Sequence, residues 1–326
     1  MRYIKQKMNT EKVDKKEVSK EGVSPSLEPV VEVEIAPTEV AEAEPEKEGN
    51  TPTESSEKEP LKELRKFPTL VDFFATVGVF VFSVLVGSLV AVLLMKSQGY
   101  ESIPPHITFI YYLIQLLPTI AFLLWRRNRA GRDSGLYFGF RNLNLPMLLW
   151  GVVLLLATGV VIEPLLSLFP TEGYEAVMQT VGLGGWAILS TVVAAPILEE
   201  VLFRGLIFES CGERFGKGGA LIISALLFGL IHGVPVQMVN AFVVGLILGY
   251  VYLRTRSLIS VMIIHAVNNA IAYATIALFG NAGDVTLREV ISQDWLYWVL
   301  YGLSALVFIW ALVRLRKTLR DNTEVE

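Results

Sequence analysis

The chain has 326 residues, of which 52% are hydrophobic, and its charged residues are unevenly distributed. Residues 1–66 carry 12 Lys/Arg and 16 Asp/Glu, whereas the other 260 residues carry only 16 of each, a charged fraction about half that of an ordinary soluble domain. This composition excludes a soluble globular enzyme and a nucleic-acid-binding protein. The single cysteine, Cys211, excludes a disulfide-rich secreted domain and a cysteine-based zinc site.

The first 66 residues are predicted to form a disordered tail. Their start is basic, and residues 21–60 hold 12 acidic and 2 basic side chains with prolines among them. Such a segment cannot bury enough apolar surface to offset the entropy lost on ordering. No apolar run follows the basic start, so we do not expect this segment to be a signal peptide. We expect a solvated tail, and an arm that docks on a protein partner is the alternative.

Eight apolar runs follow the tail, and a helix needs about 20 residues to cross a bilayer. Most runs reach that length, although the fifth is short and the sixth is marginal. We therefore expect an all-α, polytopic membrane protein of about eight transmembrane helices over residues 67–320, followed by a C-terminal tail at 321–326. The apolar runs lie near residues 70–95, 107–125, 146–169, 184–208, 219–232, 236–253, 258–279 and 294–314.

Basic residues alternate between the loops that join these runs. Thirteen Lys/Arg follow the second, fourth, sixth and eighth runs, whereas the opposite loops contain only Lys96 and Arg288. Short loops rich in Lys and Arg remain on the cytoplasmic side of a membrane. We therefore expect an integral membrane protein with both termini in the cytoplasm, in a bacterial inner membrane.

The fourth run contains ionisable residues that a bilayer disfavours. A charged side chain at the centre of a membrane helix costs about 2.5–3.5 kcal/mol, yet Glu199, Glu200 and Arg204 lie within six residues. Glu200 and Arg204 are four residues apart and are predicted to form a structural ion pair, which leaves Glu199 to point elsewhere. Pro196 should kink the helix beside them and so favour a polar cavity. Glu163, in the third run, is expected to reach the interface or a neighbouring helix instead of lining that cavity.

Two later runs add imidazole and carboxamide groups. Phe228 and His232 are four residues apart near the end of the fifth run, and His265 and Asn269 have the same spacing in the seventh. A lone membrane histidine usually packs and bonds structurally, but the joint pattern supplies a carboxylate, two imidazoles and a carboxamide. These groups can activate a water molecule and stabilise an oxyanion.

The three motifs, Glu199-Glu200-x-x-x-Arg204, Phe228-x-x-x-His232 and His265-x-x-x-Asn269, resemble those of a known family of intramembrane proteases. This is the CAAX prenyl endoprotease and bacteriocin-processing (CPBP or Abi) family, and the resemblance covers roughly residues 180–280. It implies hydrolysis of a peptide bond in a membrane-tethered substrate, such as a prenylated CAAX protein or a leader peptide. It also implies that Glu199 activates water with help from His232, that His265 and Asn269 hold the oxyanion, and that Phe228 packs the site.

The sequence leaves alternatives open for the cofactor and for the function. The sequence has no His-Glu-x-x-His helix, so we expect catalysis without a metal. If zinc is used, then Glu199, His232 and His265 are the candidate ligands. An ion- or proton-coupled transporter would also place Glu, Arg and His inside the membrane, and a non-catalytic immunity or scaffold protein could keep the same framework.

Overall fold

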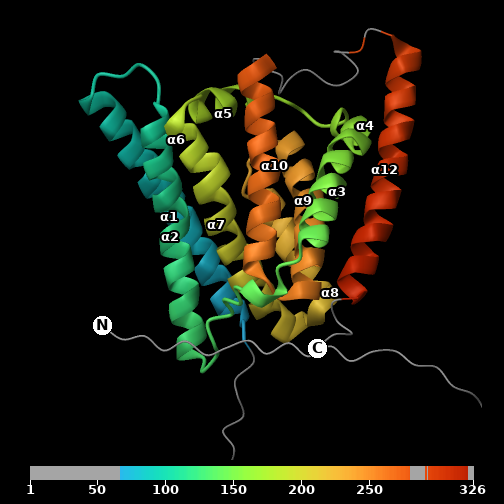
Figure 1. The fold of residues 1–326 in the computed structure, drawn as a ribbon. Coiled ribbons are helices and arrows are strands. Elements are labelled where there is room, and N and C mark those ends of the chain that lie inside the picture. The colour runs from blue at the N-terminus through green and yellow to red at the C-terminus, as the bar shows by residue number, and fades with distance from the viewer. Residues whose placement is uncertain (1–66, 280–290, 292, 322–326) are drawn as a thin grey trace, which may run out of the picture. The chain divides into compact units, whose positions relative to one another are not determined.

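The computed structural model describes residues 67–279, 291 and 293–321, all within one compact unit, Pro60–Glu326. The predictions for residues 1–66 and 322–326 lie outside the described residues. Every regular element in the described part is helical (Figure 1), as predicted. The elements in chain order are α1 (Leu70–Ser97), α2 (Pro105–Arg129), η1 (Phe140–Asn142), α3 (Leu145–Val161), α4 (Glu163–Leu166), α5 (Tyr174–Val181), α6 (Gly185–Ile188), η2 (Leu189–Ala194), α7 (Ala195–Glu200), η3 (Val201–Phe208), α8 (Glu209–Leu230), α9 (Pro235–Thr255), α10 (Leu258–Phe279) and α12 (Asp294–Asp321).

Six helical stretches in the described residues are long and apolar enough to cross a membrane, which supports a polytopic membrane protein. The expected count of eight is not confirmed. The third apolar run forms the shorter helix α3, of 17 residues. The fourth and fifth runs are joined in one continuous helical stretch, Gly185–Leu230.

That continuous stretch nevertheless reverses direction within α8. Gly216 has φ 73° and ψ 173°, which is not helical and which a residue with a side chain adopts only under strain. The Ser224 hydroxyl, past this point, donates to the Phe203 carbonyl in η3 at 2.8 Å. The end of α8 therefore runs back alongside η3 and brings Phe228 and His232 beside the helix that carries the two glutamates.

The return arm of α8 packs closely on α9 because glycines line the contact. A Cβ atom at Gly229 would lie 2.6 Å from the Met238 carbonyl, and one at Gly245 would lie 3.1 Å from the Ala225 Cα. Small residues that let two backbones approach are typical of helix contacts in membranes. This contact places His232, at the end of α8, next to the first turns of α9.

The start of α1 is fixed by a capping box that also binds α2. The Asp72 amide donates to the Thr69 hydroxyl at 3.1 Å, and the Thr69 amide donates to the Asp72 carboxylate at 2.8 Å, so orphan amides at the helix start are satisfied. Arg126, near the end of α2, binds the same carboxylate through Nε at 2.8 Å. The two helices are therefore antiparallel neighbours.

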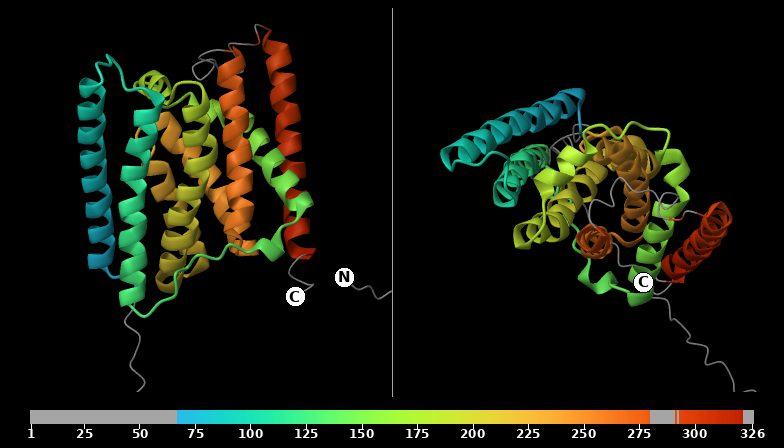
Figure 2. Two further views of the ribbon diagram at one scale, coloured as in Figure 1. Left: turned by 60° about the vertical axis from the view of Figure 1, so that its left-hand side comes forward. Right: turned by 90° about the horizontal axis from the view of Figure 1, so that it is seen from above.

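The helices that carry the three motifs, η2 to α10, lie in the middle of the described structure, with α1 and α2 at one edge and α3 and α12 at the other (Figures 1 and 2). One buried apolar cluster joins α3, α9, α10 and α12 through residues such as Leu154, Leu248 and Ala311. A second joins α2, η3 and α8 through residues such as Leu116, Phe203 and Phe228. The polar site lies where these two clusters meet.

Candidate active site

The helix that carries the two glutamates is irregular on both sides of them. Its first part, η2, and its later part, η3, are π-helical, and the α-helical turn α7 lies between them. The Ala195 amide bonds to the Ser190 carbonyl, five residues back, just before Pro196, which has no amide hydrogen to donate. The expected disturbance at Pro196 is thus a widened helix, a form often found at functional sites.

Glu200 and Arg204 form a fully buried ion pair. Arg204 Nη1 donates to Glu200 Oε1 at 2.9 Å, and both side chains have 0% exposure. Arg204 Nη2 also donates to the Gly245 carbonyl in α9 at 3.0 Å, and its guanidinium carbon lies 4.6 Å from the centre of the Phe228 ring. The pair therefore connects η3 to α8 and α9, which fits a structural role.

The same carboxylate binds a histidine. His265 Nδ1 lies 2.8 Å from Glu200 Oε1, and its other ring nitrogen, Nε2, lies 3.7 Å from Glu199 Oε2. A ring nitrogen that binds a carboxylate fixes the orientation of the imidazole. Glu200 therefore holds His265 of α10 in a position where its Nε2 atom faces Glu199.

Glu199 is 6% exposed and has a second partner that sequence reasoning missed. The hydroxyl of Tyr112, from α2, donates to Glu199 Oε1 at 2.5 Å. One carboxylate oxygen is thus bound by Tyr112 while the other faces His265. The only signal in the sequence was a phenol in an apolar run, which is too common at membrane interfaces to single it out.

His232 and Phe228 lie at the end of α8. His232 Nδ1 is 2.8 Å from the Phe228 carbonyl, so Nε2 is the ring nitrogen left to meet a ligand. The Phe228 ring centre is 5.2 Å from that of His232 and 5.8 Å from that of His265, and both contacts are edge-on. Phe228 therefore packs between the two imidazoles, beside the Arg204 guanidinium.

Asn269 lies one turn beyond His265 in α10 and contacts the π-helical segment. Its Nδ2 atom donates to the Thr191 carbonyl of η2 at 2.9 Å, and its Oδ1 atom accepts a long bond from Asn268 at 3.4 Å. An amide nitrogen carries two hydrogens. Asn269 can therefore keep its contact with η2 and still offer one hydrogen to a ligand.

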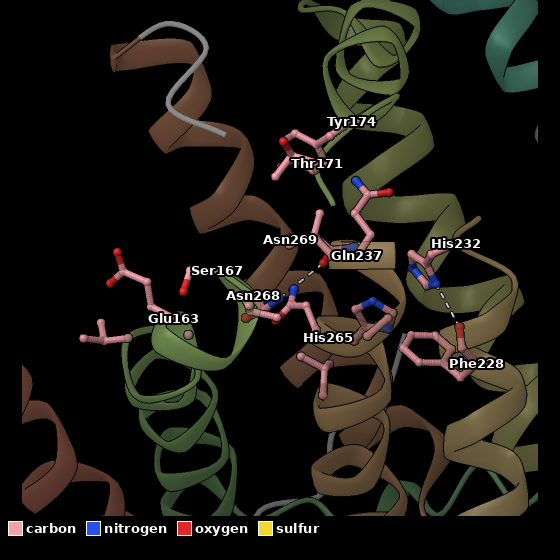
Figure 3. Close-up of a pocket in the computed structure, with 17 residues that line it drawn as sticks. Glu163, Ser167, Thr171, Tyr174, Phe228, His232, Gln237, His265, Asn268 and Asn269 are labelled. Atoms are coloured by element: carbon pink, nitrogen blue, oxygen red, sulfur yellow. Dashed lines mark hydrogen bonds between the residues drawn. The ribbon is translucent and has the colours of Figure 1, made fainter. Parts of the chain in front are cut away.

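A cavity of about 450 Å³ opens beside these residues (Figure 3). Its wall includes Phe228, His232, His265 and Asn269. Glu199 is not part of the wall and lies behind His265, whose Nε2 atom is 3.7 Å from Glu199 Oε2. Glu163 lines the cavity as well, so the expectation that it lies elsewhere was wrong. The rest of the wall is formed by apolar residues such as Val160, Val236 and Val244 and by neutral polar ones, namely Ser167, Thr171, Tyr174, Gln237, Asn240 and Asn268.

The described residues contain no group of three or more His, Cys, Asp or Glu side chains placed to hold a metal ion. The candidate ligand set of Glu199, His232 and His265 is therefore not gathered around one point in this arrangement. His265 directs one nitrogen to each of two carboxylates, and His232 Nδ1 is bound to a backbone carbonyl. In this arrangement these residues do not fit a metal centre.

Comparison with known proteins supports the family resemblance over the segment that holds the three motifs. A protein of Bacillus subtilis (strain 168) named "Putative membrane peptidase YdiL" is 27% identical over 86 residues, which are 26% of this chain and 35% of that protein. The matched region thus spans about a third of the relative. No solved structure gives a significant match. Residues 182–271 match the family described as type II CAAX prenyl endopeptidase Rce1-like, and the resemblance predicted from the motifs is confirmed over this segment.

Proposed function

We propose that the protein is an intramembrane endopeptidase that hydrolyses a peptide bond in a membrane-associated substrate. The observation that carries this proposal is a cavity whose wall includes His232, His265 and Asn269, with the buried Glu199 carboxylate behind His265. The match of residues 182–271 to an endopeptidase family supports it, as does the name of the bacterial relative.

In the proposed reaction Glu199 takes a proton from a water molecule held by His232 Nε2. The water oxygen attacks the carbonyl carbon of the substrate, and the developing oxyanion accepts hydrogen bonds from His265 and Asn269. Collapse of this intermediate breaks the C–N bond, and the proton returns from Glu199 to the leaving amine. The loss of one oxyanion donor commonly costs about 10²–10³ in rate.

The arrangement of the side chains fits these roles. The Tyr112 hydroxyl donates to one oxygen of the Glu199 carboxylate at 2.5 Å, and the other oxygen lies 3.7 Å from His265 Nε2, so the base is positioned before a substrate arrives. Because the carboxylate lies behind the cavity wall, water has to reach it past His265.

The test uses purified protein in liposomes with a lipid-anchored, internally quenched peptide library. We expect cleavage by the wild-type protein and its loss, by at least about 10²-fold, in Glu199→Gln and His232→Ala. Glu213→Gln is the matched control, because it makes the same chemical change at a carboxylate that pairs with Arg127 and Arg132 outside the cavity. Full activity of Glu199→Gln contradicts the assigned role.

The same liposomes address the other functions that the sequence allows. An ion gradient imposed across them would be dissipated by a transporter in a Glu199-dependent manner, without cleavage of any peptide. A scaffold or immunity protein would show neither activity.

For this protein we propose a multi-pass arrangement in a bacterial inner membrane with both termini in the cytoplasm, because Lys and Arg gather at one end of the helices.

A further inference from the structure

The cavity of the candidate site has a buried floor and an exposed mouth. Phe228 and His265 are only 1% and 4% exposed, and they form the floor. The exposed lining residues come instead from the end of α3, from the segment after α4 and from the second turn of α9, namely Gly159, Ser167, Thr171 and Asn240. Figure 3 shows Thr171 and Tyr174 on the far side of Asn269 from Phe228. The cavity therefore opens toward the end of the helices where α4 and α5 lie (Figure 1).

The opposite end of the helices carries the positive charge. In the described residues, 13 of the 15 Lys and Arg lie where α2, α9 and α12 end, in the loop from α2 to α3, and where α8 reverses. The other two are Arg204, in the site, and Lys96, at the end of α1. The end with the cavity mouth carries the acidic residues Glu101, Glu163, Glu172 and Asp294.

The basic end is closed over the site by the loop between α2 and α3. The Leu258 amide, at the start of α10, donates to the Tyr137 carbonyl at 2.9 Å, and the Ser257 hydroxyl donates to the Gly139 carbonyl at 3.0 Å. At Gly135 a Cβ atom would lie 2.5 Å from the Gly205 carbonyl, so this loop lies directly on η3, next to Arg204. None of these residues lines the cavity.

From this arrangement we infer that the site receives its substrate from the non-cytoplasmic side of the membrane. Loops rich in Lys and Arg stay in the cytoplasm, so the closed, basic end faces the cytoplasm and the cavity mouth faces away from it. The substrate class is then an extracytoplasmic peptide segment of a secreted or membrane-tethered chain, and not the cytoplasmic tail of a lipid-anchored protein. The substrate class rests on the proposed function, whereas the direction in which the cavity opens does not depend on it.

Cysteine labelling tests that direction without any need for catalysis. Thr171 at the mouth and Ser134 in the loop at the basic end are both exposed residues with small hydroxyl side chains, so Thr171→Cys and Ser134→Cys form a matched pair. The native Cys211 is buried, and the wild-type protein measures its background. In intact bacterial cells a membrane-impermeant maleimide should label Thr171→Cys at once and Ser134→Cys only after permeabilisation. The reverse pattern, or labelling of both before permeabilisation, overturns the inference.

Vesicles of defined orientation test the substrate. A quenched peptide with a fatty-acyl anchor is added to the outer surface of right-side-out or inside-out membrane vesicles that contain the protein. We expect Glu199-dependent cleavage in right-side-out vesicles, at least about tenfold faster than in inside-out ones. Cleavage only in inside-out vesicles contradicts this inference but keeps the proposed endopeptidase. The absence of cleavage in both contradicts the proposed function, and the labelling pattern still decides the direction.

Discussion

The buried ion pair gives the sharpest prediction for stability. In Glu200→Gln the carboxylate that binds both Arg204, at 2.9 Å, and His265, at 2.8 Å, is replaced by a neutral amide. Arg204 keeps its bond to the Gly245 carbonyl and its contact with Phe228, but its charge is left in a site of 0% exposure. Loss of one partner of a buried pair typically costs about 3–5 kcal/mol.

A loss of that size is a large share of a stability of about 5–15 kcal/mol. We therefore expect a lower folded yield and a fall in the unfolding midpoint of about 10 °C. The measurement is thermal unfolding of the purified protein in detergent, followed by intrinsic fluorescence and by aggregation. Glu213→Gln is the control, because Glu213 is 26% exposed and its partner Arg132 is 24% exposed, and such a pair contributes only about 0–1 kcal/mol. The buried Arg127, which lies 3.3 Å from Glu213, keeps its shorter ion pair with Asp133 at 2.9 Å in this variant.

Two results would refute this reasoning. If Glu200→Gln unfolds at the wild-type midpoint, as Glu213→Gln is expected to do within a few degrees, then the pair at the site is not the structural element that the contacts indicate. If Glu200→Gln folds normally but has lost turnover, then Glu200 acts in the reaction and not only as the residue that orients His265.

Three further predictions concern the site. Tyr112→Phe removes the bond to Glu199 Oε1; since bonds to charged groups contribute about 1.5–3 kcal/mol, kcat should fall about tenfold or more in a peptide-cleavage assay, and an unchanged kcat contradicts the positioning role. Glu163→Gln neutralises a carboxylate of the cavity wall and should raise KM severalfold for peptides that contain Lys or Arg, but not for neutral ones; an equal effect on both kinds excludes charge recognition. Washing with a chelator should leave cleavage unchanged, because the described residues gather no three-donor metal set; elemental analysis of the active protein checks this, and activity restored only by added zinc contradicts it.

The sequence predicted the parts of the site that follow from spacing along a helix. Glu200 and Arg204, four residues apart, pair as expected. His265 and Asn269 both line the cavity. Spacing also separated Glu199 from the ion pair, since Glu199 bonds to Tyr112 and not to Arg204. These relations depend on local geometry, which a short stretch of sequence determines.

Relations between distant segments could not be predicted in the same way. Contact between Tyr112 and Glu199 joins two residues 87 positions apart, and it depends on how α2 packs against α7. Glu163 lines the cavity because the third apolar run ends early at Val161, and the sequence does not mark that end. The fourth and fifth apolar runs form one continuous helical stretch that reverses at Gly216. The sequence does not mark this point, because many glycines do not adopt the backbone conformation that Gly216 has.

The account as a whole depends on Glu199 as the base that activates water for peptide-bond hydrolysis. The most direct measurement is a quantitative comparison of protein N-termini in membranes of cells that carry either the wild-type protein or Glu199→Gln, expressed at equal levels. We expect a set of new N-termini on membrane-tethered or secreted proteins that appears only with the wild-type protein. The same set of N-termini in both membranes would contradict the central claim.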